Sequence, residues 1–387
     1  KKFLGNEVPD EKLDEICKDA YNFDVPLEEL SDGKFVIRLD QGPTASFKDF
    51  AARAMARLVE FFLNRKGESL VILTATSGDT GSAVANAFHR RKNIKVIVLF
   101  PEKEVSKRQR KQMTTLGENI TSIAIKGKFD DCQAMVKQAF SDAELKDMNL
   151  SSANSINIGR LLPQSVYYFY AYGRVASSPQ DKIVFSVPSG NFGNVSAGII
   201  AMKMGLPVEK FVIATNENDE FPEFMQNNSY EKVVPSRNCL SNSMNVGHPS
   251  NLVRIINLYG GWMDETGCIK EMPDLELMKK DLFTTAITDK QTVETIKQVH
   301  KGFDTILEPH GAVGWNALQT FLKTNETGLC VSLETAHPSK FPEIIKKSLG
   351  IDPEDSECIK EVSQKQESFE IMENDYEKFK KFLKESI

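Results

Sequence analysis

The hydrophobic residues between positions 67 and 147 follow two alternating patterns. Short continuous apolar runs are typical of strands that are buried on both faces, and longer stretches with apolar residues three or four positions apart are typical of helices. The runs predict strands at 70–75, 95–100 and 120–125, and the stretches predict helices at 80–91, 106–116 and 130–139. Strands that alternate with helices in this way favour a parallel sheet with helices on both faces.

A similar alternation returns in the second part of the chain. Between its regular elements, residues 218–250 are rich in Asn, Ser and Pro, which predicts a long functional loop. In this part we expect helices at 156–172, 194–204, 290–301 and from 312, and strands at 182–187, 211–215, 305–307 and 329–333. At the two ends we expect a helix within 8–30, a strand at 34–39, a helix at 47–63 and a charged, helical segment at 358–387.

These elements predict an α/β protein with two α/β domains, largely parallel sheets with helices on both faces, and a helical N-terminal segment. A chain of 387 residues is too long for one minimal core, so more than one domain is expected. The expected domains are a helical segment at 1–33, a small α/β lid at 67–147, and a large α/β domain formed by 34–66 and 148–387. Because the chain starts at Lys1 without Met, we expect the N-terminal segment to be truncated.

The composition argues against nucleic acid, metal ions and membranes as partners. The formal net charge is −6, and no basic cluster with interleaved aromatic residues is visible, so nucleic acid is not expected as a partner. The six cysteines are scattered without a C-x-x-C pair or a His at metal spacing, which indicates reduced thiols and no metal site. The apolar runs are far shorter than the ~20 residues of a membrane span, and no signal peptide is visible. We therefore expect a cytoplasmic protein.

Two glycine-containing turns lie between a predicted strand and a predicted helix. The first is 189–194 (SGNFGN) and the second is 76–81 (TSGDTG). Glycines at such a turn allow backbone N–H groups to close on an anion, and the helix N-terminus adds a favourable partial charge. One turn of this kind is equally consistent with a tight connection that binds nothing. Two of them suggest a ligand with two anionic groups, or a cofactor phosphate that faces a substrate anion.

Lys48 lies at the start of the predicted helix 47–63, directly after a Gly-Pro turn. The positive end of the helix dipole favours the neutral amine, which is the nucleophilic form of a lysine. The ordinary alternative is a surface lysine without a chemical role.

Five short segments together resemble the threonine synthases, pyridoxal phosphate (PLP) enzymes of the tryptophan-synthase-β fold type, also called fold type II. The pattern is similar to that of the bacterial and fungal branch of the family. The segments occur in the order 42–49 (GPTASFKD), 76–81 (TSGDTG), 152–157 (SANSIN), 189–194 (SGNFGN) and 335–338 (TAHP). The resemblance therefore covers nearly the whole chain.

The resemblance implies a role for each matching residue. Lys48 matches the lysine that binds PLP as a Schiff base, and Thr335 matches the hydroxyl at the pyridine nitrogen, which leaves that nitrogen largely unprotonated. Asp79 stands where cysteine synthases carry an Asn that contacts the ring hydroxyl, so that contact is not carried over. The loop that binds the cofactor phosphate is Gly190, Asn191, Phe192, Gly193 and Asn194, and the expected substrate-binding residues are Ser77, Gly78, Asp79, Thr80, Ser152, Asn154 and Arg160.

The reaction that the resemblance implies is the conversion of O-phospho-L-homoserine and water to L-threonine and phosphate, in a monomer or homodimer. Two alternatives remain at this point. A phospholyase of the same fold makes 2-oxobutyrate from the same substrate, and a homologue without activity only binds the cofactor. A threonine or serine dehydratase is less consistent with the segments 152–157 and 335–338, and a nucleotide-binding α/β protein is the alternative without any resemblance.

Overall fold

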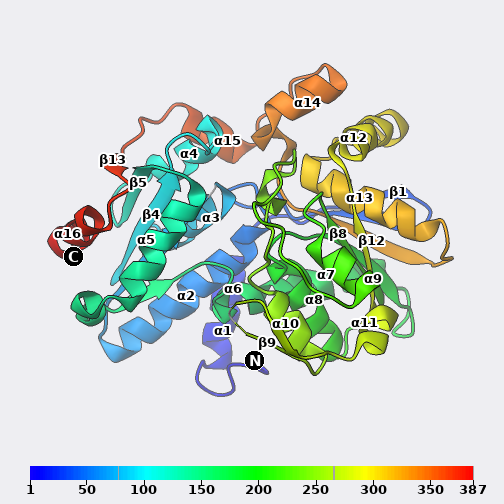
Figure 1. The fold of residues 1–387 in the computed structure, drawn as a ribbon, viewed down its shortest axis with the longest axis horizontal. Coiled ribbons are helices and arrows are strands. Elements are labelled where there is room, and N and C mark those ends of the chain that lie inside the picture. Colours follow the sequence, from blue (N-terminus) through cyan, green and yellow to red (C-terminus); the bar gives the residue numbers. More distant parts are fainter. Residues whose placement is uncertain (77, 265, 387) are drawn as a thin grey trace. The chain divides into compact units, whose positions relative to one another are not determined.

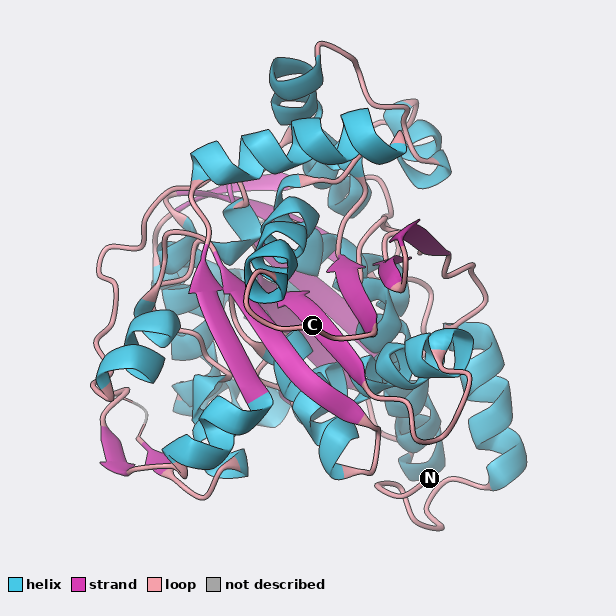
Figure 2. Ribbon diagram, turned by 90° about the vertical axis from the view of Figure 1, so that its right-hand side faces the viewer, coloured by secondary structure: helices cyan, strands magenta, loops and turns pink. Residues whose placement is uncertain are grey.

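The computed structural model describes residues 1–76, 78–264 and 266–386, and it is shown in Figure 1 with its helices and strands labelled. The chain forms two compact units. Unit 1 comprises Lys1–Asp24, Gly42–Pro163 and Asp355–Ile387, and unit 2 comprises Val25–Gln41 and Gln164–Glu354. Each unit has its own sheet and its own helices, so the fold is the α/β class that the sequence predicts (Figure 2).

Unit 1 is built on a five-stranded sheet in the order β13-β5-β4-β3-β6, and the paired strands are all parallel. Its strands are β3 (Leu70–Ala75), β4 (Ile94–Pro101), β5 (Ile120–Lys126), β6 (Leu150–Ser152) and β13 (Glu370–Glu373). Its helices are α1 (Asp10–Ala20), α2 (Lys48–Lys66), α3 (Asp79–Phe88), α4 (Lys107–Thr114), α5 (Phe129–Ser141), the short η1 (Ala143–Met148), α6 (Ile158–Leu161), α15 (Glu357–Ser363) and α16 (Tyr376–Ser386).

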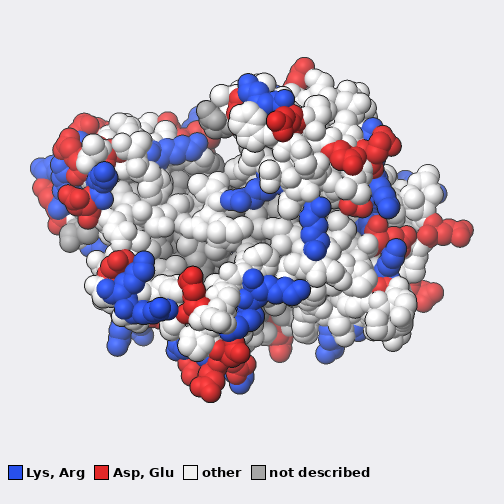
Figure 3. Space-filling view, turned by 90° about the horizontal axis from the view of Figure 1, so that it is seen from below, with Lys and Arg blue, Asp and Glu red and all other residues white. Residues whose placement is uncertain are grey.

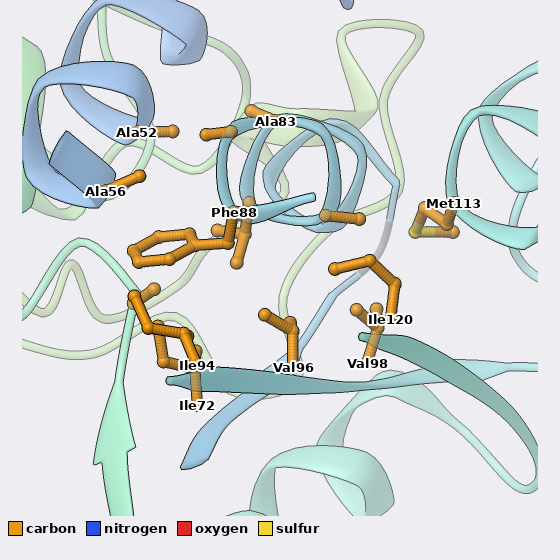
Figure 4. Close-up of a cluster of buried hydrophobic side chains, with 14 of the residues drawn as sticks. Ala52, Ala56, Ile72, Ala83, Phe88, Ile94, Val96, Val98, Met113 and Ile120 are labelled. Atoms are coloured by element: carbon orange, nitrogen blue, oxygen red, sulfur yellow. The ribbon is translucent and has the colours of Figure 1, made fainter. Parts of the chain in front are cut away.

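The sheet of unit 1 has a hydrophobic core on each face, because alternate residues of a strand point to opposite faces. On one face Ile72, Val96 and Val98 pack with Phe88 of α3 and with Ala52 of α2 (Figure 4). On the other face the intervening residues of β3, β4 and β5 pack with α5 and α16. A strand buried on both faces needs an unbroken apolar run, which is why these strands can be recognised in the sequence.

Unit 2 is built on a six-stranded sheet in the order β1-β2-β12-β7-β8-β11. Within this sheet β1 and β2 pair in the antiparallel direction, and the other neighbouring strands of the described chain pair in parallel. The strands are β1 (Leu27–Ser31), β2 (Lys34–Arg38), β7 (Ile183–Pro188), β8 (Val208–Thr215), β11 (Leu282–Ala286) and β12 (Leu329–Glu334), with a separate pair β9 (Trp262–Met263) and β10 (Ile269–Glu271). The helices are α7 (Ser165–Val175), α8 (Gly193–Lys203), α9 (Glu220–Asn227), η3 (Asn242–Met244), α10 (Leu252–Leu258), α11 (Leu275–Asp281), α12 (Asp289–Phe303), α13 (Pro309–Leu322), η4 (Pro338–Lys340) and α14 (Pro342–Leu349), and η2 (Leu162–Gln164) precedes α7.

The structure corrects several predicted elements. The helix expected within 8–30 ends at Ala20, and Leu27–Ser31 forms the edge strand β1. Residues 305–307 form no strand, and the loop expected at 218–250 contains α9 and η3. The segment 358–387 contributes the strand β13 as well as helices. The missed strand β13 is held by hydrogen bonds to β5, which is far away in the sequence and which local periodicity does not report, whereas β1 pairs with the neighbouring β2.

The compact units also divide the chain at other positions than the expected domains. Residues 42–66 and 355–387 belong to the unit that contains 67–147, because α2 packs against α3 and β13 pairs with β5. The strand β2, which the sequence places next to α2, pairs instead with β12 of unit 2. The division follows packing across the sheets and not the order of elements along the chain.

The surface carries charges of both signs. On the face shown in Figure 3, Lys and Arg side chains lie among Asp and Glu side chains. None of the helices in the described part of the chain is long and apolar enough to cross a membrane.

Replacing Phe88 by Ala is expected to destabilise unit 1. The ring of Phe88 is fully buried between the sheet and α2, so its removal leaves a cavity that costs about 3–5 kcal/mol in the free energy of unfolding. The measurement is a urea titration that follows the loss of helical circular dichroism. Phe140→Ala is the matched control, because that ring on α5 is 41% exposed. Equal losses in the two variants would contradict the assignment of this core.

Candidate active site

Lys48 is the first residue of α2, and a tight turn before it fixes its position. The carboxylate of Asp49 accepts hydrogen bonds from the backbone N–H of Thr44 at 2.9 Å and from its hydroxyl at 2.7 Å. Gly42 has to be a glycine, since a Cβ there would lie 2.5 Å from Oδ2 of Asp49. The hydrogen bonds between Asp49 and Thr44 thus fix the backbone of the loop that leads into α2, and with it the position of Lys48.

Asp79 of α3 faces that amine. Its Oδ2 lies 3.7 Å from Nζ of Lys48, and its Oδ1 accepts a hydrogen bond of 3.0 Å from the side-chain amide of Gln109. The side chains of Lys48 and Asp79 are 17% and 3% exposed, so the ion pair is largely shielded from solvent. Asp79 was expected only as a substrate-binding residue, and its ion pair with Lys48 has no signal in the sequence because it joins residues from two different helices.

Two backbone N–H groups at the start of α3 share one acceptor within unit 1. Gly78 has φ of 144°, and the N–H groups of Gly78 and Gly81 donate to the hydroxyl of Thr76 at 2.9 and 2.8 Å. A Cβ on Gly78 would lie 2.6 Å from the side chain of Gln109. Thr80 lies in the first turn of α3, and the predicted substrate residue Ser77 lies outside the described residues.

The predicted residues of the segment 152–157 lie beside this turn. Because β6 pairs with β3 in parallel, the loops that follow the two strands leave the same edge of the sheet. Asn154 links them, since its Oδ1 accepts from the hydroxyl of Thr74 at 3.2 Å and its amide donates to the carbonyl of Ala75 at 3.3 Å. Its backbone N–H donates to the hydroxyl of Ser152 at 3.1 Å.

Arg160 contributes a buried positive charge to unit 1. Its side chain donates to the carbonyl of Ala153, and the residue is 3% exposed. Burial lowers the pKa of Arg160 to about 10, while the charge of Asp49 acts in the opposite direction. The guanidinium therefore stays charged at neutral pH, and it is suited to attract an anion because little water screens it.

In unit 2 the loop between β7 and α8 forms a cradle of backbone donors. The N–H groups of residues 190–194 have no acceptor among the described residues. Phe192 has φ of 59°, which turns the chain sharply into the first turn of α8. Consecutive free N–H groups at a helix N-terminus bind a phosphate group well, because the donors and the helix dipole act together.

Three neighbouring segments of unit 2 contact this loop. A Cβ on Gly190 would lie 2.8 Å from Cα of Met244, so the loop rests directly on that backbone. The side-chain oxygen of Asn191 accepts from the N–H and the hydroxyl of Ser250 at 3.3 and 3.2 Å. Asn194 accepts from the hydroxyls of Tyr167 and Tyr168 at 2.6 and 2.7 Å. The two tyrosines are buried core residues, and only their packing shows that they also support the loop.

A second polar cluster of unit 2 surrounds Thr335, directly after β12. The hydroxyl of Thr335 lies 3.3 Å from Oε1 of Glu308, and the backbone N–H of Glu308 donates to Glu334 at 2.7 Å. Glu308 and Glu334 are both fully buried, and Thr335 is 6% exposed. Burial raises the pKa of Glu334 well above its ordinary value, and the charge of Glu308 raises it further.

Each unit carries groups with the chemistry that a pyridoxal phosphate requires. In unit 2 the loop 190–194 has backbone donors for a phosphate and Thr335 has a hydroxyl for the pyridine nitrogen, and in unit 1 Lys48 has a primary amine. The described residues contain no group of His, Cys, Asp and Glu suited to hold a metal ion. The predicted site residues other than Ser77 lie in loops, at the end of β6 or in the first turns of helices.

Comparison with known proteins agrees with this chemistry. A family model of pyridoxal-phosphate dependent enzymes matches residues 25–331, and one of the threonine synthase C-terminal region matches residues 311–383. The threonine synthase of Haemophilus influenzae is 40% identical, with 99% of this chain and 86% of that protein covered. The PLP-bound threonine synthase of Brucella melitensis has a TM-score of 0.92 at 34% identity, and the match covers 100% of this chain and 86% of that chain. The threonine synthase of yeast has a TM-score of 0.88 at 30% identity, and the match covers 98% of this chain and 85% of that chain.

The similarity is not limited to the fold. Enzymes such as the serine ammonia-lyase of Rhizomucor miehei share the architecture at a TM-score of 0.61 but are only 13% identical. Relatives above 30% identity instead match over nearly the full chain and share one activity by name. The fold type II architecture and the PLP cofactor predicted from the sequence are thus confirmed, and the chain belongs to the threonine synthase family of pyridoxal-phosphate dependent enzymes.

Proposed function

We propose that this chain converts O-phospho-L-homoserine and water to L-threonine and phosphate. The observation that carries the proposal is the presence of two separate sets of anion-binding groups. The cradle at 190–194 in unit 2 suits the cofactor phosphate. The second set of proposed anion-binding groups lies in unit 1 and consists of the start of α3, Asn154 and Arg160. A substrate with both a carboxylate and a phosphate uses such a second set, whereas serine or threonine brings only a carboxylate.

Lys48 is proposed as the residue that binds the cofactor and moves protons. When bound, PLP supplies an electron sink for the substrate carbon atoms. Nζ of Lys48 is proposed to attach the cofactor covalently, and to accept and return a proton once the substrate has displaced it. The carboxylate of Asp79 at 3.7 Å holds this amine in place, and the locked turn at Asp49 limits its motion.

The remaining predicted residues are proposed to bind and orient. Thr335 faces the pyridine nitrogen, and the N–H groups of residues 190–194 bind the cofactor phosphate. Gly78, Asp79 and Thr80, together with Ser77, receive the substrate carboxylate at the start of α3. Ser152, Asn154 and Arg160 bind the phosphate of the substrate, where a shielded guanidinium is worth more than an exposed one.

The proposal also covers the location of the enzyme, its oligomeric state and the closure of its site. We expect a cytoplasmic enzyme that works as a monomer or homodimer, and its cysteines are free thiols in the structure. The closure of residues 67–147 over the substrate stays a prediction. A closed site would keep bulk water away from reactive intermediates and admit only the water that the reaction uses, which separates threonine formation from loss of the amino group as an oxoacid.

Reduction with borohydride is expected to fix the cofactor on Lys48. The reagent makes the carbon–nitrogen link between lysine and cofactor permanent, so peptide mapping by mass spectrometry should find the pyridoxyl group on the peptide that contains Lys48. Lys48→Ala should leave no fixed label, and Lys103→Ala on the partly exposed turn after β4 should label like the wild type. Recovery of the label on another lysine would exclude the assignment.

Phosphohomoserine is expected to be consumed far faster than homoserine, serine or threonine. Each hydrogen bond from a charged group to the lost phosphate is worth about 1.5–3 kcal/mol, so homoserine should lose at least tenfold in kcat/KM. The assay measures threonine, 2-oxobutyrate and phosphate side by side. Mainly 2-oxobutyrate from phosphohomoserine would identify a phospholyase, and deamination of serine at an equal rate would identify a dehydratase. Bound cofactor without turnover of any compound would identify a homologue that only binds PLP.

A further inference from the structure

Gln109 of α4 carries a buried amide that has no part in the proposed reaction so far. Its side-chain nitrogen donates to Oδ1 of Asp79 at 3.0 Å, and the residue is 2% exposed. A Cβ on Gly78 would lie 2.6 Å from both Cδ and Nε2 of this amide, so the amide occupies the space that the glycine leaves open. Gln109 therefore contacts both residues at the start of α3, where the substrate carboxylate is proposed to bind.

The N-terminal cap of α4 determines which way this amide points. Ser106 is the N-cap of the helix, and its backbone N–H and its hydroxyl donate to Oε1 of Gln109 at 3.4 and 3.0 Å. A backbone N–H can only donate, so the amide atom that it meets has to be the oxygen. The amide nitrogen therefore points to Asp79, and it donates to Oδ1 whether or not Oδ2 carries a proton.

The same hydrogen bond determines which oxygen of Asp79 faces Lys48. Oδ1 accepts from Gln109, and Oδ2 lies 3.7 Å from Nζ of Lys48. Without the amide the carboxyl group would rotate, and the flexible stem of the lysine would sample more positions. A reacting group that is held in one geometry reacts faster, because fewer orientations have to be searched.

The C-terminal segment holds another face of α4. Arg110 donates to both oxygens of Glu367, at 2.8 and 3.1 Å, and the hydroxyl of Thr114 donates to the same carboxyl group at 3.0 Å. The bond from Arg110 lowers the pKa of Glu367, so this contact persists at neutral pH. The backbone N–H of Ser368 donates to the carbonyl of Thr114 at 2.7 Å. Since α4 is held by contacts other than those with α3, it is a fixed support for Asp79.

We propose that Gln109 is a positioning residue that orients the carboxyl group of Asp79 toward Nζ of Lys48 for the attachment of the cofactor. In this step Nζ bonds to the aldehyde carbon of PLP, and the aldehyde oxygen leaves as water with the two protons of the neutral amine. The inference rests on the proposed function, because it assumes that Lys48 binds PLP. It goes beyond that function, since Gln109 acts only through Asp79.

Gln109→Glu separates this role from support of the helix. Glu has nearly the same volume, and its oxygen accepts from Ser106 as the glutamine oxygen does, so the cap of α4 is kept. The group that faces Asp79 changes from a donor to an acceptor, so two carboxyl groups meet and repel each other. A purely structural role predicts that this change is tolerated, whereas the positioning role predicts that it is harmful.

The experiment measures how fast PLP attaches to the apoenzyme. Borohydride stops the reaction at increasing times, and mass spectrometry measures the label on the peptide that contains Lys48. Gln109→Glu should slow the attachment at least about tenfold at mildly alkaline pH, because a buried hydrogen bond to a carboxyl group becomes a repulsion. An attachment rate equal to that of the wild type would overturn the inference.

Thr114→Val is the matched control. It lies on the same helix, is 1% exposed, and removes a hydrogen bond to the carboxyl group of Glu367 in place of Asp79. Arg110 still holds α4 in this variant, so the attachment rate should change less than about threefold. A loss as large as that of Gln109→Glu would assign both effects to the stability of the helix and would overturn the inference.

The pH dependence gives a readout that a loss of structure does not imitate. Two carboxyl groups in contact share a proton when the pH falls, and a protonated Glu can again donate to Asp79. The ratio of the Gln109→Glu rate to the wild-type rate should therefore rise as the pH is lowered from the mildly alkaline to the mildly acid range. A ratio that does not change with pH would count against the positioning role and overturn the inference.

Gln109→Met keeps the inference testable if Gln109→Glu does not fold. Met fills the space beside Gly78 without a donor, so it should slow the attachment in the wild-type background and change it less than about twofold when Asp79→Ala has already removed the carboxyl group. An equal loss in both backgrounds would overturn the inference. A wild type that binds no PLP, or binds it on another lysine, defeats the proposed function. A wild type labelled on Lys48 at a rate that does not depend on Gln109 defeats the present inference alone.

Discussion

Backbone N–H groups at the start of a helix have no partner inside that helix, and at residues 190–194 the described structure leaves them without any other acceptor. The sheet of unit 2 brings this turn to its edge, since β7 ends at Pro188 and α8 begins at Gly193. Such a turn is stable only if its neighbours hold it, and the backbone of Met244, the contacts of Ser250 to Asn191 and the hydroxyls of Tyr167 and Tyr168 do so. We propose that the cofactor phosphate supplies the missing acceptors and so completes the hydrogen bonding of this turn.

Buried carboxylates play the same structural part in both units. Asp49 accepts from the backbone and hydroxyl of Thr44 and so locks the turn before Lys48. Glu308 accepts from the start of α13 and so locks the residues near Thr335. In each case a buried carboxyl group limits the motion of a loop beside a proposed site residue, which is the general requirement for a preorganised site.

Some strands of the two sheets were predictable from the sequence and others were not. Strands such as β3 and β4 are buried on both faces, so their apolar runs are unbroken and local. The edge strand β13 carries charged residues, and the edge strand β1 pairs with β2 alone. Neither strand has an apolar pattern along the chain that is strong enough to favour a strand over a helix. The division into units was not predictable, because it depends on which helix packs on which sheet.

The sequence by itself determined the fold class, the family, the cofactor and the identity of the residues in the two glycine turns, since these depend on residue types at fixed spacings along the chain. The tertiary structure decided what surrounds them. The ion pair of Lys48 with Asp79, the support of Asn194 by two tyrosines, and the carboxylate that connects Thr335 with His310 all join residues from separate elements. Spacing along a chain reports only neighbours on one element, whereas hydrogen bonds and charges act across space between elements that packing brings together.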